Sequence, residues 1–178
     1  MSKKSTFLAK LTNTLVEYQH VLIILLSAFL ISTSSWIMMG RSLRASASIW
    51  DYLHVYLGLV AAGLSISMLV SNCIKGKWRQ FFPWLVLDFS HLIKDISGLC
   101  KGKLPAAGGR GLFSIIEGIG ILLLVGVGFT GVLWYCLQGS SDALFWRSNH
   151  IVFAQGFMGF ILIHIICAGL HLLDFIRN

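Results

Sequence analysis

Four long runs of apolar residues dominate the sequence and are separated by shorter polar segments. They cover residues 21–39, 49–70, 112–137 and 151–173. A helix needs about 20 apolar residues to span a bilayer, and in lipid each backbone amide must be bonded within its own segment. The pattern therefore predicts an all-α integral membrane four-helix bundle, which forms a single domain over residues 1–178.

The composition agrees with a membrane protein. Apolar residues make up 56% of the chain, charged residues make up 12%, and the mean hydropathy is +0.80. The first run is too long for the apolar part of a signal peptide and is followed by no small-residue cleavage site, so we expect no cleaved leader. The four cysteines are scattered without a CxxC motif, which argues against a disulfide framework or a metal cluster.

Lysine and arginine are distributed unevenly over the polar segments. Three lie before the first run, seven between the second and third, and one after the fourth, whereas the other two loops contain only Arg41, Arg44 and Arg147. The positive-inside rule then predicts a multi-pass protein of the bacterial inner membrane with both termini in the cytoplasm. The net charge of +7 follows from this bias and suits anionic lipid, so it gives no reason to expect nucleic acid as a partner.

The long loop between the second and third runs contains a further periodic segment. Between residues 82 and 100, apolar side chains recur at helical spacing against polar ones, which predicts an amphipathic helix on the cytoplasmic membrane surface. The apolar positions are Leu85, Phe89, Leu92, Ile93, Ile96 and Leu99. Residues 104–111, with one proline and three glycines, interrupt regular structure before the third run.

Four of the six histidines fall at matched depths in the predicted bundle. His150 and His164 lie 14 residues apart, which brings them within about 40° of the same face and about 21 Å apart along one helix. Because neighbouring spans alternate in direction, His54 comes level with His150, and His20 lies on the inner side with His164. The sequence thus predicts two pairs of imidazoles, one near each side of the membrane.

Two such pairs are what two bis-histidine haems require. Neutral imidazole is a good iron ligand, and a ring at membrane depth otherwise lacks partners. We expect His54 and His150 to bind the outer haem iron, and His20 and His164 the inner one. By residue counting alone, His171 is as near to the depth of His20 as His164 is, but a haem there would lie about 10 Å further from its neighbour. Alternatively, each histidine is an interfacial or hydrogen-bonded core residue.

Several stretches of the chain resemble a known family. In order they are QHVLIILLSAFLIS, LHVYLGLVAA, FPWLVLDFSHLIKDISGLCKGK, FTGVLW and HIVFAQGFMGFILIH, the last containing a His-x13-His. The chain resembles the dihaem cytochrome b membrane subunits of respiratory formate dehydrogenases, nickel–iron hydrogenases and thiosulfate reductases, a prokaryotic cytochrome b561-like family. The match runs through almost the whole chain, and the His-x13-His with a histidine opening the first span is its specific part.

The resemblance implies roles for particular residues. In that family the first-span histidine pairs with the later fourth-span histidine and the second-span histidine with the earlier one, which carries over as His20 with His164 and His54 with His150. The family's quinone pocket lies beside the inner haem, where the third span starts. Here that stretch, residues 106–110, reads Ala-Ala-Gly-Gly-Arg and lacks the polar amide side chain of the family.

Three further positions in the spans are candidates for the cofactor sites. Gly156 and Gly159 lie between the two ligands of the fourth span, where small residues let a porphyrin approach the backbone, although helix packing also favours glycine. Glu117 lies one to two turns inside the third span, where a carboxylate is costly unless it has a function. It is a candidate proton relay to a quinone, and the alternative is a residue at the water boundary.

The three arginines of the periplasmic loops are candidates for binding the outer haem. Arg41, Arg44 and Arg147 carry guanidinium groups that suit propionate carboxylates. A partner protein or lipid headgroups would serve equally well as their partners.

These observations predict a transmembrane electron conduit, the quinone-reactive membrane subunit of an oxidoreductase complex. Electrons from a periplasmic iron–sulfur or cytochrome subunit would cross two haem b groups and reduce menaquinone or ubiquinone, or flow in reverse. The chain offers no molybdenum, nickel or iron–sulfur site, so chemistry on the final substrate would belong to another chain. The alternatives are a stand-alone cytochrome b561-like quinone oxidoreductase and a haem-free membrane protein that binds metal or assists assembly.

Overall fold

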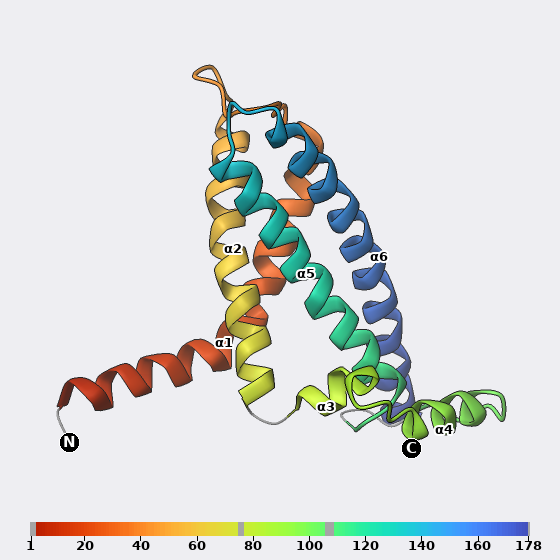
Figure 1. The fold of residues 1–178 in the computed structure, drawn as a ribbon. Coiled ribbons are helices and arrows are strands. Elements are labelled where there is room, and N and C mark those ends of the chain that lie inside the picture. The colour runs from red at the N-terminus through yellow and green to blue at the C-terminus, as the bar shows by residue number, and fades with distance from the viewer. Residues whose placement is uncertain (1–2, 75–76, 106–108, 178) are drawn as a thin grey trace. The chain divides into compact units, whose positions relative to one another are not determined.

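The described part of the chain consists of helices joined by turns and loops. The computed structural model describes residues 3–74, 77–105 and 109–177, and these ranges contain no strand. The elements, shown in Figure 1, are α1 (Lys3–Thr33), η1 (Ser34–Trp36), α2 (Ile49–Ile74), α3 (Trp78–Phe81), η2 (Pro83–Leu85), α4 (Ser90–Leu99), α5 (Leu112–Cys136) and α6 (Asp142–Arg177). Four stretches are long and apolar enough to cross a membrane, namely Glu17–Trp36, Ile49–Ile74, Leu112–Cys136 and Asp142–Leu173. The predicted all-α fold with four spans is confirmed.

The first span ends earlier than its apolar run. Residues 37–39 were expected in the helix, but they belong to an irregular loop that continues to residue 48. The hydroxyls of Ser32, Thr33 and Ser34 bond to carbonyls of the preceding turn, and such bonds offer the backbone an alternative to the helix. Asp51 of α2 then accepts the amide N–H of Met38 at 3.0 Å, which holds the loop against the next span.

The fourth span begins earlier than its apolar run. α6 starts at Asp142 instead of residue 151, so His150 lies about two turns inside the helix instead of opening it. An acidic residue in the first turn is stabilised by the helix dipole. Farther along, the side chain of Asn149 donates to the carbonyl of Phe145 at 2.9 Å, so this polar segment bonds within its own helix.

Contacts along the chain divide it into two compact units. The first unit contains the described residues of 1–71 and 125–152, and the second contains those of 72–124 and 153–178. Helices α5 and α6 therefore each contribute to both units. The predicted outer ligands His54 and His150 belong to the first unit, whereas the predicted inner ligands are divided, with His20 in the first and His164 in the second.

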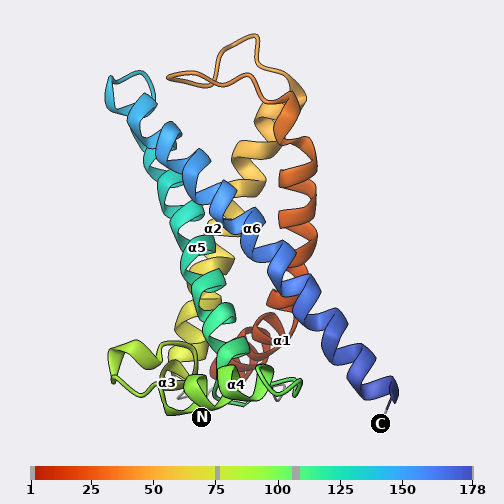
Figure 2. The same ribbon diagram turned by 90° about the vertical axis from the view of Figure 1, so that its right-hand side faces the viewer.

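In the first unit, the loop of residues 37–48 is fastened to the turn between α5 and α6, which Figures 1 and 2 show at the same end of this unit. Three hydrogen bonds hold it: from Trp134 Nε1 to the carbonyl of Gly40 at 3.0 Å, from the Gly139 amide to the carbonyl of Arg41 at 3.0 Å, and from the Leu43 amide to Gln138 Oε1 at 2.8 Å. Beneath the loop lies a small core of Val55, Trp134 and Ala143. The loop therefore forms a fixed cover at one end of this unit.

In the second unit, α3 and α4 lie near the start of α5, and Figure 2 shows α4 beside that start. Gly118 of α5 admits α3 because any Cβ at that position would collide with the backbone of Phe81. Asp95 of α4 accepts the amide N–H of Leu112 at 2.9 Å, which satisfies an amide that has no partner inside α5. These two contacts join the surface segment to the span.

The amphipathic surface helix is shorter than predicted. The helical spacing extended back to residue 82, but α4 covers only Ser90–Leu99. Pro83 lacks an amide hydrogen and Leu87 has a φ of 54°, so the backbone cannot continue as an α-helix there. Within α4, Ile93 and Ile96 are 65% and 48% exposed. An exposed apolar stripe on a helix of this kind fits a lipid surface.

Candidate haem-binding site

Two of the predicted ligands, His54 and His150, lie face to edge in the first unit. His54 is one to two turns inside α2 and His150 about two turns inside α6, so the two helices bring the rings to the same level. The ring centroids are 6.3 Å apart and the ring planes make an angle of 82°. Both side chains are half-buried. The structure thus brings together the two histidines that the sequence paired by depth alone.

The ring of His150 is oriented by the backbone of α5. Its Nδ1 lies 3.0 Å from the carbonyl oxygen of Val127 and 3.4 Å from the hydroxyl of Thr130. A carbonyl only accepts hydrogen bonds, so this contact requires the proton on Nδ1 and leaves the lone pair on Nε2. Histidines that bind metals commonly donate their second N–H in this way. The geometry therefore prepares Nε2 of His150 as a ligand.

Gly131 makes room for the His150 ring. A Cβ built at this position would lie 3.3 Å from both Cε1 and Nδ1 of His150. That is closer than ordinary van der Waals contact, so a side chain at 131 would push the ring away from Val127. Gly128, the next glycine toward the centre of α5, is needed for a different reason. A Cβ built there would lie 2.9 Å from Ala62 of α2.

His54 lacks one of its expected hydrogen bonds. Its Nδ1 is fully buried and has no hydrogen-bond partner among the described residues. A buried polar atom without a partner is costly and calls for an explanation, such as a bound group that completes the site. One turn further along α2, a Cβ at Gly58 would meet nothing within 4 Å. His54 therefore has an incomplete polar environment and open space beside it on the same helix.

Arg41 and Arg44 project from the loop that covers this end of the first unit. Both side chains are exposed, while the carbonyl of Arg41 is held by the Gly139 amide. Neither guanidinium forms an ion pair with another described residue. Two cations on a fixed loop near His54 and His150 can bind carboxylates of a cofactor or of a partner surface.

The predicted inner ligands have separate surroundings. His20 is exposed on α1. In the second unit, His164 is half-buried with its ring centroid 5.4 Å from that of Phe160, and His171 packs on Phe113 with the centroids 4.4 Å apart. Nε2 of His171 is buried without a hydrogen-bond partner in the described ranges. Both His164 and His171 therefore stay open as partners of His20.

The two candidate glycines of α6 differ in their surroundings. At Gly156 a Cβ would lie 3.1 Å from Cδ2 of Leu123 on α5, so close helix packing accounts for this glycine. At Gly159 a Cβ would meet no atom within 4 Å. Only Gly159 therefore faces open space of the kind that a porphyrin could occupy.

Glu117 lies on α5 in the second unit and is half-buried. It precedes Gly118, the glycine that contacts Phe81. Within residues 3–74, 77–105 and 109–177, no hydrogen bond or ion pair involves its carboxylate. Glu117 is thus a carboxylate in a spanning helix with no such bond among the described residues, and its role as a proton relay stays a prediction.

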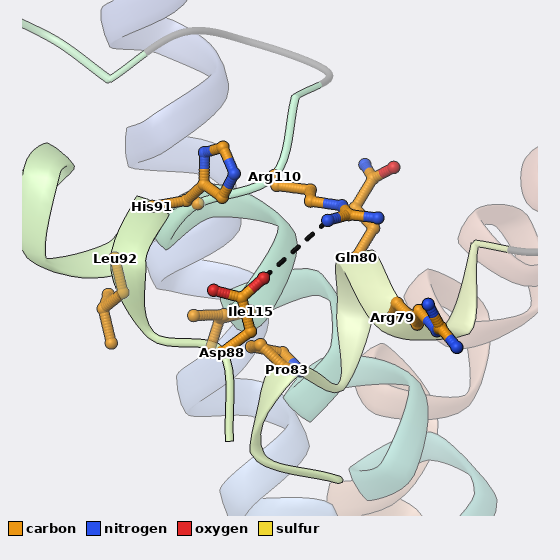
Figure 3. Close-up of a pocket in the computed structure, with 9 residues that line it drawn as sticks. Arg79, Gln80, Pro83, Asp88, His91, Leu92, Arg110 and Ile115 are labelled. Carbon is orange, nitrogen blue, oxygen red and sulfur yellow. Dashed lines mark ion pairs between the residues drawn. The ribbon is translucent and has the colours of Figure 1, made fainter. Parts of the chain in front are cut away.

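A shallow pocket opens to the surface where α5 begins, between α3 and α4. It is lined by Arg79, Gln80, Pro83, Asp88, His91, Leu92, Arg110, Gly111 and Ile115 (Figure 3). The guanidinium of Arg110 lies 3.8 Å from the carboxylate of Asp88, and hydrogen bonds from Ser90 lower the pKa of that carboxyl. The pocket is at the position where the sequence predicted a quinone, although residues 106–108 of that stretch lie outside the described residues.

Comparison with known protein families agrees with the geometry of the His54–His150 pair. The profile of the family described as prokaryotic cytochrome b561 matches residues 12–174. The chain belongs to this family. No curated protein and no solved structure matches the chain. As a prokaryotic cytochrome b561, it is a membrane cytochrome b that binds haem b and transfers electrons. Membership of a haem b family speaks against the haem-free alternative.

The residues around His54 and His150 fit the haem that a cytochrome b561 carries. The ring centroids lie 6.3 Å apart, so both imidazoles would be available to hold the iron of a haem b, which would supply the redox chemistry. The bond to Val127 and the unpartnered Nδ1 of His54 agree with this assignment.

Reading of the sequence missed the residues that support this cytochrome b561 site. Val127 contributes through its backbone carbonyl, for which a sequence holds no signal. Thr130 and Gly131 are the second and third residues of the FTGVLW stretch, so the resemblance pointed to the segment without giving its purpose. The sequence predicted a quinone at the start of α5 but not the residues that line the pocket there, because these come from three separate segments of the chain.

Proposed function

We propose that this cytochrome b561 conducts electrons across the bacterial inner membrane between a periplasmic redox subunit and the quinone pool, through two bis-histidine haems. The observation that carries the proposal is the His54–His150 pair, whose ring centroids lie 6.3 Å apart. A second pair near the other side of the membrane would complete the path. Chemistry on the ultimate substrate would occur in the partner complex.

At the outer site, the protein supplies two ligands and holds them in place. The Nδ1–H of His150 donates to Val127, so Nε2 would be free to hold the iron as a neutral imidazole. Haem b supplies the redox chemistry by cycling between ferric and ferrous iron. Arg41 and Arg44 on the covering loop are suited to hold the propionates, and their exposure also allows them to meet an acidic surface of a periplasmic partner.

For the inner haem, the ligands we propose are His20 and His164. The His-x13-His spacing supports His164, because it shares a face with His150 on one helix. His171 is the competing ligand, and its unpartnered Nε2 gives it some support. His164→Ala and His171→Ala distinguish the two. We expect the first variant to lose one haem and the second to keep both, and the reverse result would assign the ligand to His171.

The quinone site is proposed at the pocket between α3, α4 and the start of α5. Arg110 and His91 line it and can donate hydrogen bonds to quinone carbonyls. Glu117 lies on α5, seven residues beyond Arg110, and a half-buried carboxylate there can relay protons during quinone reduction. The quinone would be menaquinone or ubiquinone. Electrons could flow in either direction, since the ligand geometry sets no potential.

The test is a spectrum and a quinol titration of the purified protein. We expect a reduced α-band near 560 nm, as is usual for haem b, two haems per chain, and reduction by a short-chain quinol. The variant His91→Ala/Arg110→Ala should keep both haems but react with quinol more slowly. Two haems with an unchanged quinol rate in that variant would remove the quinone site from this pocket and leave the haem assignment intact.

A stand-alone cytochrome b561-like oxidoreductase is the second candidate. Arg41 and Arg44 are exposed on an ordered loop. This exposure supports the second candidate because two exposed cations suit a small, diffusing anionic oxidant as well as a protein partner. Purification from native membranes separates the two candidates. Co-migration of an iron–sulfur or cytochrome subunit supports the complex, and a haem-loaded chain that purifies alone supports the second candidate.

A further inference from the structure

Gln19 is a buried polar residue in the first span that no part of the haem assignment uses. Its side chain is 5% exposed. Its Nε2 donates to the hydroxyl of Ser71 at 3.0 Å, and its Oε1 accepts from the hydroxyl of Ser67 at 3.2 Å. Ser67 and Ser71 lie four residues apart on the same face of α2. One amide of α1 is therefore bonded at both ends to two serines of α2.

These bonds fix the rotation of α1 against α2. Apolar contacts alone set the rotation of a membrane helix weakly, because lipid tails contact apolar side chains as well as a neighbouring helix does. The other buried residues of this part of α1, Ile23 and Ser27, follow Gln19 at intervals of four, so the three residues share the face that packs inward. Among these three residues, it is Gln19 whose hydrogen bonds to α2 give the contact a direction.

The residue directly after Gln19 is His20. Consecutive residues of an α-helix are separated by about 100° around the axis. Once Gln19 is bonded to α2, the direction of His20 around α1 is therefore set, at the edge of the α1–α2 contact. A longitudinal slip of α1 would break both bonds, so the depth of His20 is set as well.

We infer that Gln19, through Ser67 and Ser71, is the positioning residue that sets the direction and depth of His20 as a haem ligand. The inference rests on the proposed function, in which His20 binds the inner haem iron. Removing these bonds leaves the ligand in the chain but lets α1 rotate. The effect should therefore appear at the inner haem and leave the outer haem unchanged.

The experiment compares Gln19→Leu with Ser67→Ala/Ser71→Ala, which removes the same bonds from the opposite helix. Ser32→Ala is the matched control, because its hydroxyl bonds to the carbonyl of Ala28 within α1 and, among the described residues, not to α2. The readouts are haem per chain, the reduction potential of each haem, and the low-spin electron paramagnetic resonance signal, which depends on the orientation of the two imidazole planes. His20→Ala is measured in parallel.

We expect Gln19→Leu and Ser67→Ala/Ser71→Ala to shift and broaden the signal of the inner haem and to change the reduction potential of that haem. Both variants should also lose part of the inner haem. The outer-haem signal and the Ser32→Ala protein should match the wild type. If Gln19→Leu is not recovered as folded protein, the double serine variant alone decides the result. Combining Gln19→Leu with the serine changes should add no further effect, since all three act on one set of bonds.

Three outcomes would overturn the inference. Wild-type signals and potentials in Gln19→Leu and Ser67→Ala/Ser71→Ala would show that the bonds from Gln19 to α2 do not position His20. Equal disturbance of both haems would show that Gln19 serves general packing. Two haems in His20→Ala would remove His20 as a ligand, and this result would contradict the proposed function itself, independently of Gln19.

Discussion

His150 has a fixed environment whose parts can be tested one residue at a time. Its depth opposite His54 followed from the sequence, because helix rise and alternating direction determine it. Its orientation did not follow, because the partner of Nδ1 is a backbone carbonyl at Val127, and every residue of α5 has one. For the same reason, the unpartnered Nδ1 of His54 could be recognised only in three dimensions.

Gly131→Leu should weaken binding of the outer haem. A side chain at 131 would crowd the His150 ring, whose Cε1 and Nδ1 lie 3.3 Å from the position of a Cβ. Loss of such support commonly lowers metal affinity about 10- to 100-fold. Gly63→Leu is the control, because a Cβ there meets nothing within 4 Å. Haem retention measured during dilution should fall in the first variant and not in the second, and equal retention in both would refute the crowding argument.

Glu117→Gln tests the proton relay. The amide keeps the size and polarity of the side chain but cannot carry a proton between groups. We expect both haems and unchanged spectra, with slower quinol oxidation whose pH dependence flattens. Wild-type turnover from about pH 6 to about pH 8 would identify Glu117 as a boundary residue without a catalytic role.

The helices illustrate which features an apolar pattern predicts. Four spans follow because lipid forces each backbone segment to bond internally, and α2 and α5 begin at the predicted residues. The ends that differ depend on specific side-chain bonds. Hydroxyl groups end α1 early, and Pro83 with the left-handed Leu87 shortens the surface helix. Periodicity contains no information on either feature.

The turn before α4 should depend on pH. Hydrogen bonds from the Ser90 hydroxyl and amide to Asp88 lower the pKa of the Asp88 carboxyl below its ordinary value of 3.8. Such a group stabilises the folded turn above the ordinary value, and the contribution is lost as the pH falls through the lowered pKa. Hydrogen exchange of the first α4 amides should show less protection at about pH 3 than at about pH 6.

The variant Asp88→Asn separates this carboxylate from other acidic groups. It should already show reduced protection of the Ser90 amide at neutral pH, and little further change on acidification. Asp142→Asn, at the start of a different helix, serves as the control. An unchanged pH response in Asp88→Asn would mean that another carboxyl controls the turn.

At the scale of the whole molecule, the chain is a membrane cytochrome b561 with four spans, for which we propose two haem sites. Family membership and the four spans were predicted from the sequence and are shown. The inner pair remains a prediction, because His20 and His164 belong to different compact units. The ligands of the inner haem, the quinone and the partner subunit can each be tested separately.

The central claim is that His54 and His150 bind the same iron. The most direct measurement is the ratio of haem to protein in His54→Ala, His150→Ala and the double variant, each purified in the same way as the wild type. If both histidines bind one haem, removing either of them or both loses that same haem. All three variants should therefore retain one haem per chain where the wild type has two. A double variant that loses more haem than either single variant, or a single variant that keeps both haems, would contradict the claim.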